Sequence, residues 1–164
     1  MAYSADQLSG LQCIRDAALR YCRVVDRLDI ELMKSAYWEG ATDDHGFMGD
    51  AWKFCEMCME AHLPWRSTGH CILNHAIELI DAHTATGEVY NVTYLFQDAQ
   101  PVLDLWVGRY LDKYKKRDDE WRIIERVCVH EGTHSAPVNA MEFDTSNFRQ
   151  GSFDRPSSGR PIGP

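Results

Sequence analysis

The spacing of apolar residues changes near Arg66, and this change limits the chain to a mixed fold. Before Arg66, apolar side chains recur every three or four residues, which is typical of one face of an amphipathic helix. After it, apolar and polar residues alternate along several stretches, as they do on the two faces of a strand. Helices followed by a run of strands predict the α+β class, with helices packed against one face of an antiparallel sheet.

The two halves predict separate sets of elements. Helices are expected over residues 5–25, about 29–37 and about 50–63, and Pro64 ends the last of them. The polar stretch 41–46 predicts a brief edge strand. Longer strands are expected over residues 69–81, 88–96, 102–117 and 120–132. Turns are predicted at Thr86-Gly87, between the first two long strands, and at residues 116–119, between the last two.

Length and composition indicate one globular domain with a tail. A chain of 164 residues can bury most of its apolar surface, and its 45% hydrophobic and 26% charged residues are ordinary for a globular protein. From Ser135 onward the chain is rich in Pro, Gly, Ser and Arg and lacks any period, although it contains Phe143, Phe148 and Phe153. We therefore expect a domain over residues 1–134 and an irregular tail over residues 135–164 that packs on a neighbouring subunit of a homo-oligomer, either a dimer or a trimer.

Charge and hydropathy exclude several classes of partner. The formal net charge of −8 disfavours binding to nucleic acid or to an anionic membrane. No apolar run is long enough to span a bilayer, and the polar first ten residues do not resemble a signal peptide. We therefore expect a cytoplasmic protein without nucleic-acid or membrane partners.

The cysteines and one acidic cluster raise the possibility of a metal site. Cys55 and Cys58 form a C-x-x-C that lies inside a predicted helix, and no second pair has the spacing of a zinc site. We expect buried, reduced thiols, no structural zinc and no essential disulfide. Asp43, Asp44 and His45 are suitable ligands, but consecutive strand residues point to opposite faces. No metal is therefore expected.

Three polar residues are candidates for chemistry. Asp26 ends the first helix, His70 begins the first long strand, and Arg126 lies in the last strand on the same face as His130. A histidine bonded to a buried carboxylate is a fixed base, and an arginine can hold an anionic oxygen. If the sheet curls over the helices, these residues converge on an aromatic cavity lined by Tyr21, Trp52, Phe54, Trp65, Tyr90 and Tyr94.

The residues alone leave structural roles open for each of these candidates. His70 is also interpretable as a hydrogen-bonded core residue, and Asp26 as a cap of the second helix. Arg126 could form an ordinary ion pair on the sheet with Glu125 or Glu131. The density of Trp and Tyr nevertheless favours an aromatic or polycyclic ligand. No nicotinamide, flavin, phosphate or metal motif is present, so no cofactor is expected.

Four stretches together resemble the SnoaL-like group of the nuclear-transport-factor-2-like superfamily. They are YCRVVDRLD from Tyr21, DHG from Asp44, GHCILN from Gly69, and the hairpin of residues 108–127 with its sequence DDEWR. The resemblance covers about residues 11–132. The group includes scytalone dehydratase, hexachlorocyclohexane dehydrochlorinase, bile acid dehydratase, polyketide cyclases and diarylpropane formaldehyde-lyases. It implies a cone-shaped, curved antiparallel sheet wrapped around the N-terminal helices and enclosing one deep pocket.

The resemblance also implies roles for single residues. His70 matches the catalytic histidine, Asp26 the carboxylate that orients it, and Tyr21 a pocket tyrosine. Arg126 matches an arginine that assists the leaving group. His45 occupies the position of a substrate-binding tyrosine, which makes it a candidate second acid or base. His130 is a further candidate for the pocket, together with the aromatic residues Trp52, Trp65, Tyr90 and Tyr94.

The expected function is that of a cofactor-free lyase. The enzyme would use the His70–Asp26 pair to eliminate water, or formaldehyde from a lignin-derived aromatic dimer, from a small hydrophobic substrate. Three alternatives remain: a polyketide cyclase or isomerase, a non-catalytic ligand-binding protein, and a small structural subunit like that of a ring-hydroxylating oxygenase.

Overall fold

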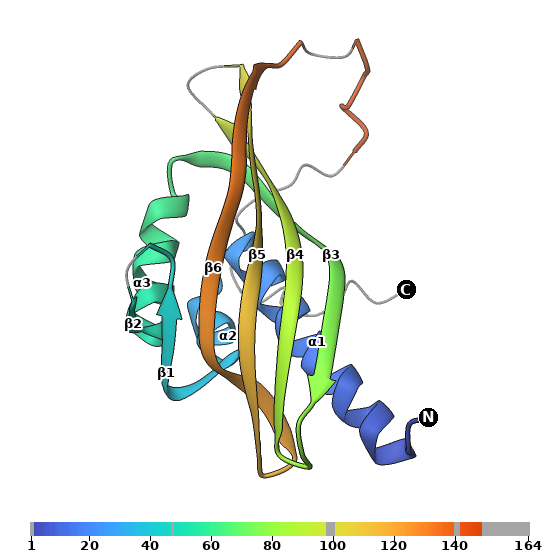
Figure 1. The fold of residues 1–164 in the computed structure, drawn as a ribbon. Coiled ribbons are helices and arrows are strands. Elements are labelled where there is room, and N and C mark those ends of the chain that lie inside the picture. Colours follow the sequence, from blue (N-terminus) through green and yellow to red (C-terminus); the bar gives the residue numbers. More distant parts are fainter. Residues whose placement is uncertain (1, 47, 98–100, 140–141, 149–164) are drawn as a thin grey trace.

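The computed structural model describes residues 2–46, 48–97, 101–139 and 142–148. In chain order, its elements are α1 (Ala5–Val25), α2 (Ile30–Lys34), β1 (Tyr37–Asp44), β2 (Met48–Asp50), α3 (Ala51–His62), β3 (Trp65–Leu79), β4 (Thr84–Gln97), β5 (Val102–Arg117) and β6 (Glu120–Pro137). The expected α+β class is confirmed. Figure 1 shows the long strands side by side, with α1 and α2 behind them and α3 at one side.

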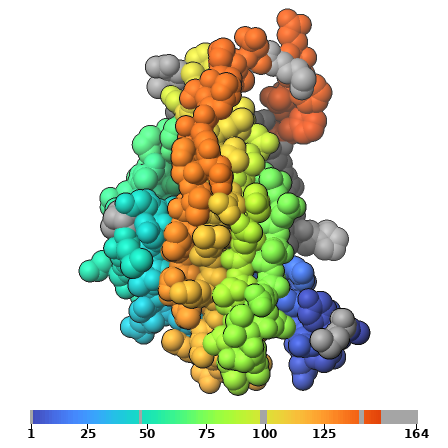
Figure 2. All heavy atoms as spheres, viewed as in Figure 1, coloured from blue at the N-terminus to red at the C-terminus, as the bar shows by residue number. Residues whose placement is uncertain are grey.

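The six strands form one curved, unclosed sheet in the order β2-β1-β6-β5-β4-β3. From β3 to β6 the chain runs as an antiparallel meander, whereas β1 pairs with β6 in parallel. The outer face of this meander covers much of the surface seen in Figure 2. The inner face therefore packs against the helices, and the sheet curves around them.

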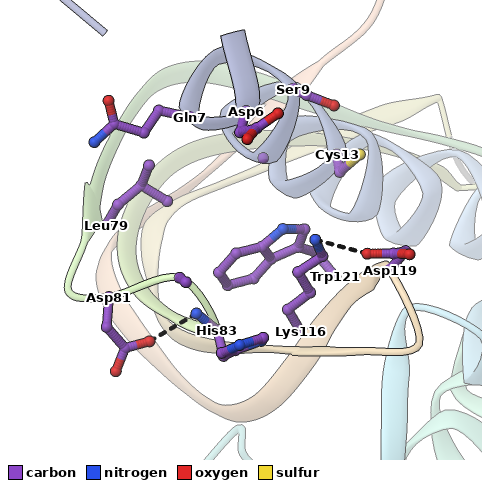
Figure 3. Close-up of a pocket in the computed structure, with 12 residues that line it drawn as sticks. Asp6, Gln7, Ser9, Cys13, Leu79, Asp81, His83, Lys116, Asp119 and Trp121 are labelled. Carbon is purple, nitrogen blue, oxygen red and sulfur yellow. Dashed lines mark hydrogen bonds and ion pairs between the residues drawn. The ribbon is translucent and has the colours of Figure 1, made fainter. Parts of the chain in front are cut away.

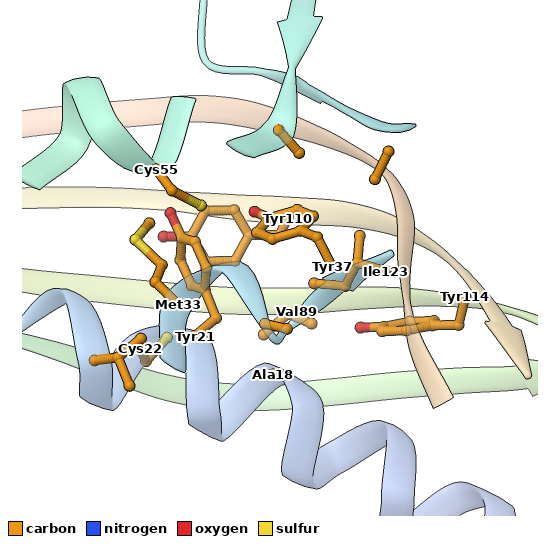
Figure 4. Close-up of a cluster of buried hydrophobic side chains, with 14 of the residues drawn as sticks. Ala18, Tyr21, Cys22, Met33, Tyr37, Cys55, Val89, Tyr110, Tyr114 and Ile123 are labelled. Atoms are coloured by element: carbon orange, nitrogen blue, oxygen red, sulfur yellow. The ribbon is translucent and has the colours of Figure 1, made fainter. Parts of the chain in front are cut away.

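Helix α1 provides the apolar side of the core. Ser4 caps its first turn through a capping box with Gln7. Apolar side chains at intervals of three and four residues are buried, as the sequence predicts. They meet a group of tyrosines from α1 itself and from strands β1 and β5, so the centre of the domain is aromatic and partly polar (Figure 4). The tyrosines of this group are Tyr21, Tyr37, Tyr110 and Tyr114.

The strand expected over residues 41–46 as an edge strand is longer and lies elsewhere. β1 begins at Tyr37 and is the second strand of the sheet, because β2 covers its outer side. The backbone N–H of Ile123 donates to the carbonyl of Ala36, so pairing with β6 begins just before β1. This pairing ends α2 at Lys34, before the residue 37 expected from the sequence. β1 therefore adds one parallel pair to a sheet whose other strand pairs are antiparallel, as predicted.

The turn predicted at Thr86-Gly87 is also wrong, because both residues lie inside β4. The chain turns earlier, where the Asp81 carboxylate accepts the backbone N–H groups of His83 and Thr84, each at 2.7 Å. Gly87 instead allows the Tyr114 ring to pack closely against β4, because a Cβ atom at this position would lie 2.9 Å from that ring. The predicted hairpin after β5 is confirmed, with positive φ angles at Asp118 and Asp119.

The last strand is longer than expected. β6 continues to Pro137, and Ser135–Pro137 pair with the start of β5. The irregular segment therefore begins after Pro137 rather than at Ser135. Phe143 and Phe148 are exposed and their rings lie 5.5 Å apart, while Phe153 lies outside the described residues. Within the described chain, no helix combines the length and the apolar character needed to cross a membrane.

Candidate functional site

A pocket of about 340 Å³ lies between α3 and the inner face of the sheet. Most of its wall is apolar and comes from Phe54, Met57, Ala61, Leu95, Trp106 and the thiol-bearing Cys58 and Cys128. Its polar groups are few, as is usual for a pocket that binds a small molecule. They are Tyr21, His45, His62, His70, Thr93 and Tyr110.

His70 and Asp26 form the hydrogen-bonded pair that the sequence predicts. The Nδ1 atom of His70 lies 2.7 Å from Oδ1 of Asp26. Asp26 also accepts the backbone N–H of His70 at 2.9 Å and the hydroxyl of Thr68 at 2.8 Å. Burial alone would raise the pKa of Asp26, but these bonds from His70 and Thr68 hold it below its ordinary value.

This geometry fixes the tautomer of His70. An ionised carboxylate only accepts hydrogen bonds, so Nδ1 carries the proton that points at Asp26. Nε2 is then the ring nitrogen left for a substrate, and it has no hydrogen-bond partner among the residues that the structure describes. A neutral His70 can therefore accept a proton inside the pocket, and Asp26 can stabilise the resulting positive charge.

We expect the contribution of Asp26 to stability to disappear in acid. Its pKa is lower in the folded chain than the ordinary 3.8, so ionised Asp26 stabilises the fold above that value. This contribution is lost as the pH falls through the lowered folded-state pKa. Urea unfolding of the wild type and of Asp26→Asn should give a stability difference that shrinks from about pH 5 downward. A difference that stays constant over this range would contradict the ionised hydrogen-bonded carboxylate.

His45 forms a second pair of the same kind. Its Nδ1 atom contacts Oδ1 of Asp43, and the other carboxylate oxygen of Asp43 accepts the Tyr37 hydroxyl at 2.6 Å. The His45 ring stacks on Phe54, with centroids 4.2 Å apart. Asp43 and His45 lie two residues apart, the spacing at which side chains of an extended chain share a face.

His62 is a pocket residue that the sequence interpretation did not include. Its Nδ1 atom lies 2.7 Å from the carbonyl oxygen of Cys58, and its ring centroid lies 5.7 Å from that of His70. Burial lowers its pKa, so the ring is neutral and presents Nε2 to the pocket as an acceptor. Helical periodicity could have found it, because Phe54, Cys58 and His62 are spaced by four residues on α3.

Arg126 lies behind the pocket wall rather than in it. The side chain is fully buried, and its Nε and Nη2 atoms each donate to Asp112 at 2.7 Å. The guanidinium stacks between the rings of Tyr21 and Tyr110, 4.2 and 4.1 Å from their centroids. Burial alone would lower its pKa, but the ion pair with Asp112 raises it well above the ordinary value. The partner is neither Glu125 nor Glu131.

Tyr21 lies on the pocket wall, where the family resemblance places a tyrosine. It lines the pocket, and burial raises the pKa of its hydroxyl, which therefore stays protonated. No hydrogen bond of this hydroxyl is made to another described residue, so it can donate to a ligand. Tyr110 lies beside it, edge to face at 5.7 Å, and its hydroxyl accepts from Asn91.

Five residues predicted in the pocket lie outside its wall. Tyr90 and Tyr94 are 39% and 40% exposed, because the alternation of β4 turns Asn91 and Thr93 inward instead. Trp52 packs on the core and donates to the carbonyl of Lys34, and Trp65 lies half-buried at the start of β3. His130 is exposed beside a register shift in the β5–β6 ladder, although its ring reaches within 6.1 Å of the Trp106 ring.

The thiols show no sign of activation. Burial raises the pKa of Cys22, Cys55, Cys58 and Cys128 to about 12, so these residues are thiols rather than thiolates at neutral pH. All six cysteines are free. Within the described ranges, no three His, Cys, Asp or Glu side chains are grouped as metal ligands.

A second hollow of about 300 Å³ lies where the first turn of α1 meets the β3–β4 and β5–β6 turns. Trp121 lies across it, with Asp81, His83, Lys116 and Asp119 around the rim (Figure 3). Lys116 and Asp119 form an ion pair at 2.8 Å, and Asp81 accepts backbone N–H groups of its own turn. None of the residues predicted to act in catalysis lies there, so the candidate site is the pocket with His70.

Comparisons with solved structures agree on the fold. A scytalone-dehydratase-like protein of Novosphingobium aromaticivorans is 17% identical, with a TM-score of 0.73 over 82% of this chain and 93% of its own. A type 2 hexachlorocyclohexane dehydrochlorinase is also 17% identical, with a TM-score of 0.71 over 87% of this chain and 98% of its own. A protein of Nostoc punctiforme with a cystatin-like fold is 17% identical, with a TM-score of 0.62 over 80% of this chain and 96% of its own.

Sequence comparison identifies the family. No protein with a curated description matches the chain. The SnoaL-like domain family, in contrast, matches residues 6–127, which span most of the chain and carry Asp26, His45 and His70. The chain therefore belongs to the SnoaL-like family.

Proposed function

We propose that the protein is a cofactor-independent lyase in which His70 removes a proton from an aromatic substrate. The observation that carries this proposal is the hydrogen bond from His70 to Asp26 at 2.7 Å, on the wall of an apolar pocket. Dehydratase-like and dehydrochlorinase neighbours support a lyase or a related activity of this family. A histidine with a structural role alone is expected to have hydrogen-bond partners at both ring nitrogens, whereas Nε2 of His70 has none among the described residues and His70 lines the pocket.

The wall suggests the following reaction. Nε2 of His70 takes a proton from carbon or from a hydroxyl group, and Asp26 stabilises the imidazolium that forms. When the proton comes from carbon, the C–H electron pair forms a double bond as the neighbouring C–O bond breaks, and the leaving oxygen takes a proton from an acid group of the pocket and departs as water. For formaldehyde, the proton comes from the hydroxyl of a hydroxymethyl group. The O–H electron pair then forms the carbonyl bond of formaldehyde, the C–C electron pair forms the double bond of the remaining product, and the C–O bond of a neighbouring hydroxyl group breaks as water departs. The Tyr21 hydroxyl donates to the oxygen that gains negative charge.

Arg126 contributes from a distance in this scheme. Its guanidinium lies behind the rings of Tyr21 and Tyr110 and is paired with Asp112, so it supports these rings without lining the pocket. We therefore assign Arg126 as a positioning residue for the tyrosine side of the pocket rather than a direct partner of the leaving group.

The size of the pocket narrows the substrate class. A volume of about 340 Å³ is near the lower end of the range for small-molecule pockets, so one or two rings fit better than a polycyclic skeleton. Phe54 and Trp106 offer aromatic faces for stacking. We propose a one- or two-ring aromatic substrate, such as a hydroxylated aromatic dimer.

The alternatives differ from this proposal in what they require. A polyketide cyclase or isomerase would use the same base without releasing a small molecule. A ligand-binding protein, or a structural subunit like that of an oxygenase, would not depend on an oriented His70. We retain a cytoplasmic location and a homo-oligomer with tail-mediated contacts as predictions.

The proposal is tested by incubating the protein with hydroxylated aromatic dimers, hydroxysteroids and polyketide-like compounds. Mass spectrometry should detect loss of water or formaldehyde from a one- or two-ring compound. The same compound should be unchanged in reactions with His70→Ala, and His83→Ala serves as control because His83 is exposed in a distant turn. A product isomeric with its substrate would favour the cyclase, and binding without any product would favour the ligand-binding protein.

A further inference from the structure

We propose that His45 is the general acid of this site and protonates the leaving group while His70 acts as the base. The inference rests on the proposed function and deepens it by assigning the second proton transfer. It starts from a geometric fact: two imidazoles on one pocket wall are each bonded to a carboxylate through Nδ1.

The surroundings of His45 fit a proton donor. Asp43 is 1% exposed, and its two oxygens are used by the His45 ring and by the Tyr37 hydroxyl. A buried carboxylate is costly unless an opposite charge compensates it, and its nearest ion-pairing group is the His45 ring. The His45 ring supplies that charge when both of its nitrogens carry a proton, and Nε2, which has no hydrogen-bond partner among the described residues, is the nitrogen left to donate within the pocket.

The position of the ring is also defined. Stacking on Phe54 at an interplanar angle of 15° and bonding to Asp43 hold the ring from its face and from one edge. The Tyr110 ring is a further neighbour, tilted relative to the imidazole with its centroid 5.8 Å away. A proton donor must keep its direction during turnover, and these contacts restrict both rotation and tilt of the ring.

The other histidine on the wall cannot take the same role. His62 bonds through Nδ1 to the carbonyl of Cys58, which carries no charge to stabilise an imidazolium, and burial lowers its pKa. The three imidazoles therefore differ by their partners: a carboxylate with three donors at His70, a buried carboxylate at His45, and a backbone carbonyl at His62. Apart from the base His70, His45 is the one histidine on the described pocket wall that is bonded to a carboxylate.

The proton balance of the reaction closes with these two residues. Nε2 of His70 takes the proton from the substrate, and the electron pair forms the new double bond as the bond to oxygen breaks. That oxygen takes the proton from Nε2 of His45, so it leaves as a neutral hydroxyl group or as water. His70 ends as imidazolium and His45 as neutral imidazole, and solvent returns both to their starting states. No oxidant or reductant is needed.

Two bicyclic probes test this assignment without knowledge of the natural substrate. A base removes the ring C–H proton of 1,2-benzisoxazole, its N–O bond breaks, and a cyanophenol forms. The oxygen of the unsubstituted compound is a poor leaving group that needs a proton, whereas that of 5-nitro-1,2-benzisoxazole departs readily as an anion. An acid is therefore important for the first probe and nearly dispensable for the second.

Absorbance at the product band should show that the wild type accelerates both probes over buffer. His45→Gln and Asp43→Asn should each lose at least about tenfold more rate on the unsubstituted probe than on the nitro probe. Asp44→Asn is the matched control and should behave as wild type, because among the described residues Asp44 accepts a hydrogen bond only from the backbone N–H of Gly46. His70→Gln should lose rate on both probes.

The outcomes separate the two proposals. Equal effects of His45→Gln on both probes, or no effect, with His70→Gln inactive on both, would overturn the role of His45 and leave the role of His70 standing. Full activity of His70→Gln would overturn the proposed function itself. A wild type that accelerates neither probe would contradict a preformed base and acid in this pocket, and both proposals with it.

Discussion

Replacing His70 by alanine should lower turnover by a factor on the order of a hundred to ten thousand while the protein remains folded. Loss of a positioned base removes the group that accepts the proton, and nothing else on the wall has a carboxylate-bonded ring in that place. Asp26 keeps the Thr68 hydroxyl and the backbone N–H of residue 70 as donors, so the fold loses little. The measurement is the steady-state rate on a compound that the wild type consumes.

Binding and folding controls separate loss of chemistry from loss of the pocket. The circular dichroism spectrum and the dissociation constant for product should stay near those of the wild type in His70→Ala. His83→Ala should keep full turnover, because this exposed histidine lies in the β3–β4 turn. If His70→Ala kept near-wild-type activity, the assignment of the base would be wrong, and His45 and His62, the other histidines on the pocket wall, would be the next residues to replace.

The largest loss of stability is expected from Asp112→Ala. Arg126 and Asp112 are a fully buried, two-bond ion pair, and Asp112 also accepts the Tyr114 hydroxyl at 2.7 Å. Removing the carboxylate leaves a buried guanidinium without a counter-charge, and Nη1 of Arg126 already lacks a hydrogen-bond partner among the described residues. We expect the free energy of unfolding to fall by about 3–5 kcal/mol.

Urea denaturation measures this loss of stability, and a variant of a surface ion pair serves as the control. Lys113 and Glu125 lie 2.9 Å apart but are largely exposed, so Lys113→Ala should change the free energy of unfolding by about 1 kcal/mol or less. A fall of less than about 1 kcal/mol in Asp112→Ala would show that water reaches Arg126, contrary to its burial.

Local patterns were sufficient for the helices and the long strands. The three- and four-residue spacing in α1, the Pro64 stop and the alternation of β5 depend on neighbours in sequence, so they are readable without tertiary contacts. The parallel partner of β1 is not local. Residues Thr42–Asp44 pair with Glu125–Val127, some eighty residues away in the sequence. The spacing of apolar residues within one segment does not show which distant strand it pairs with.

The candidate site was also predictable only in part. His70 and Asp26 are brought together as expected, whereas Tyr90 and Tyr94 are exposed because the alternation of β4 turns Asn91 and Thr93 inward. One residue of register exchanges the two faces of a strand. The partner of Arg126 was missed because Asp112 lies on the neighbouring strand β5, opposite Arg126 in the ladder.

The central claim is that the imidazole at position 70 is the base, and chemical rescue tests it most directly. In His70→Gly, the side chain is absent while Asp26 keeps its carboxylate facing the vacant space. Turnover of a compound consumed by the wild type should be nearly abolished in this variant, and it should rise with added imidazole until the space is saturated. Turnover by His70→Gly that equals the wild type without imidazole, or that imidazole does not restore, would contradict the claim.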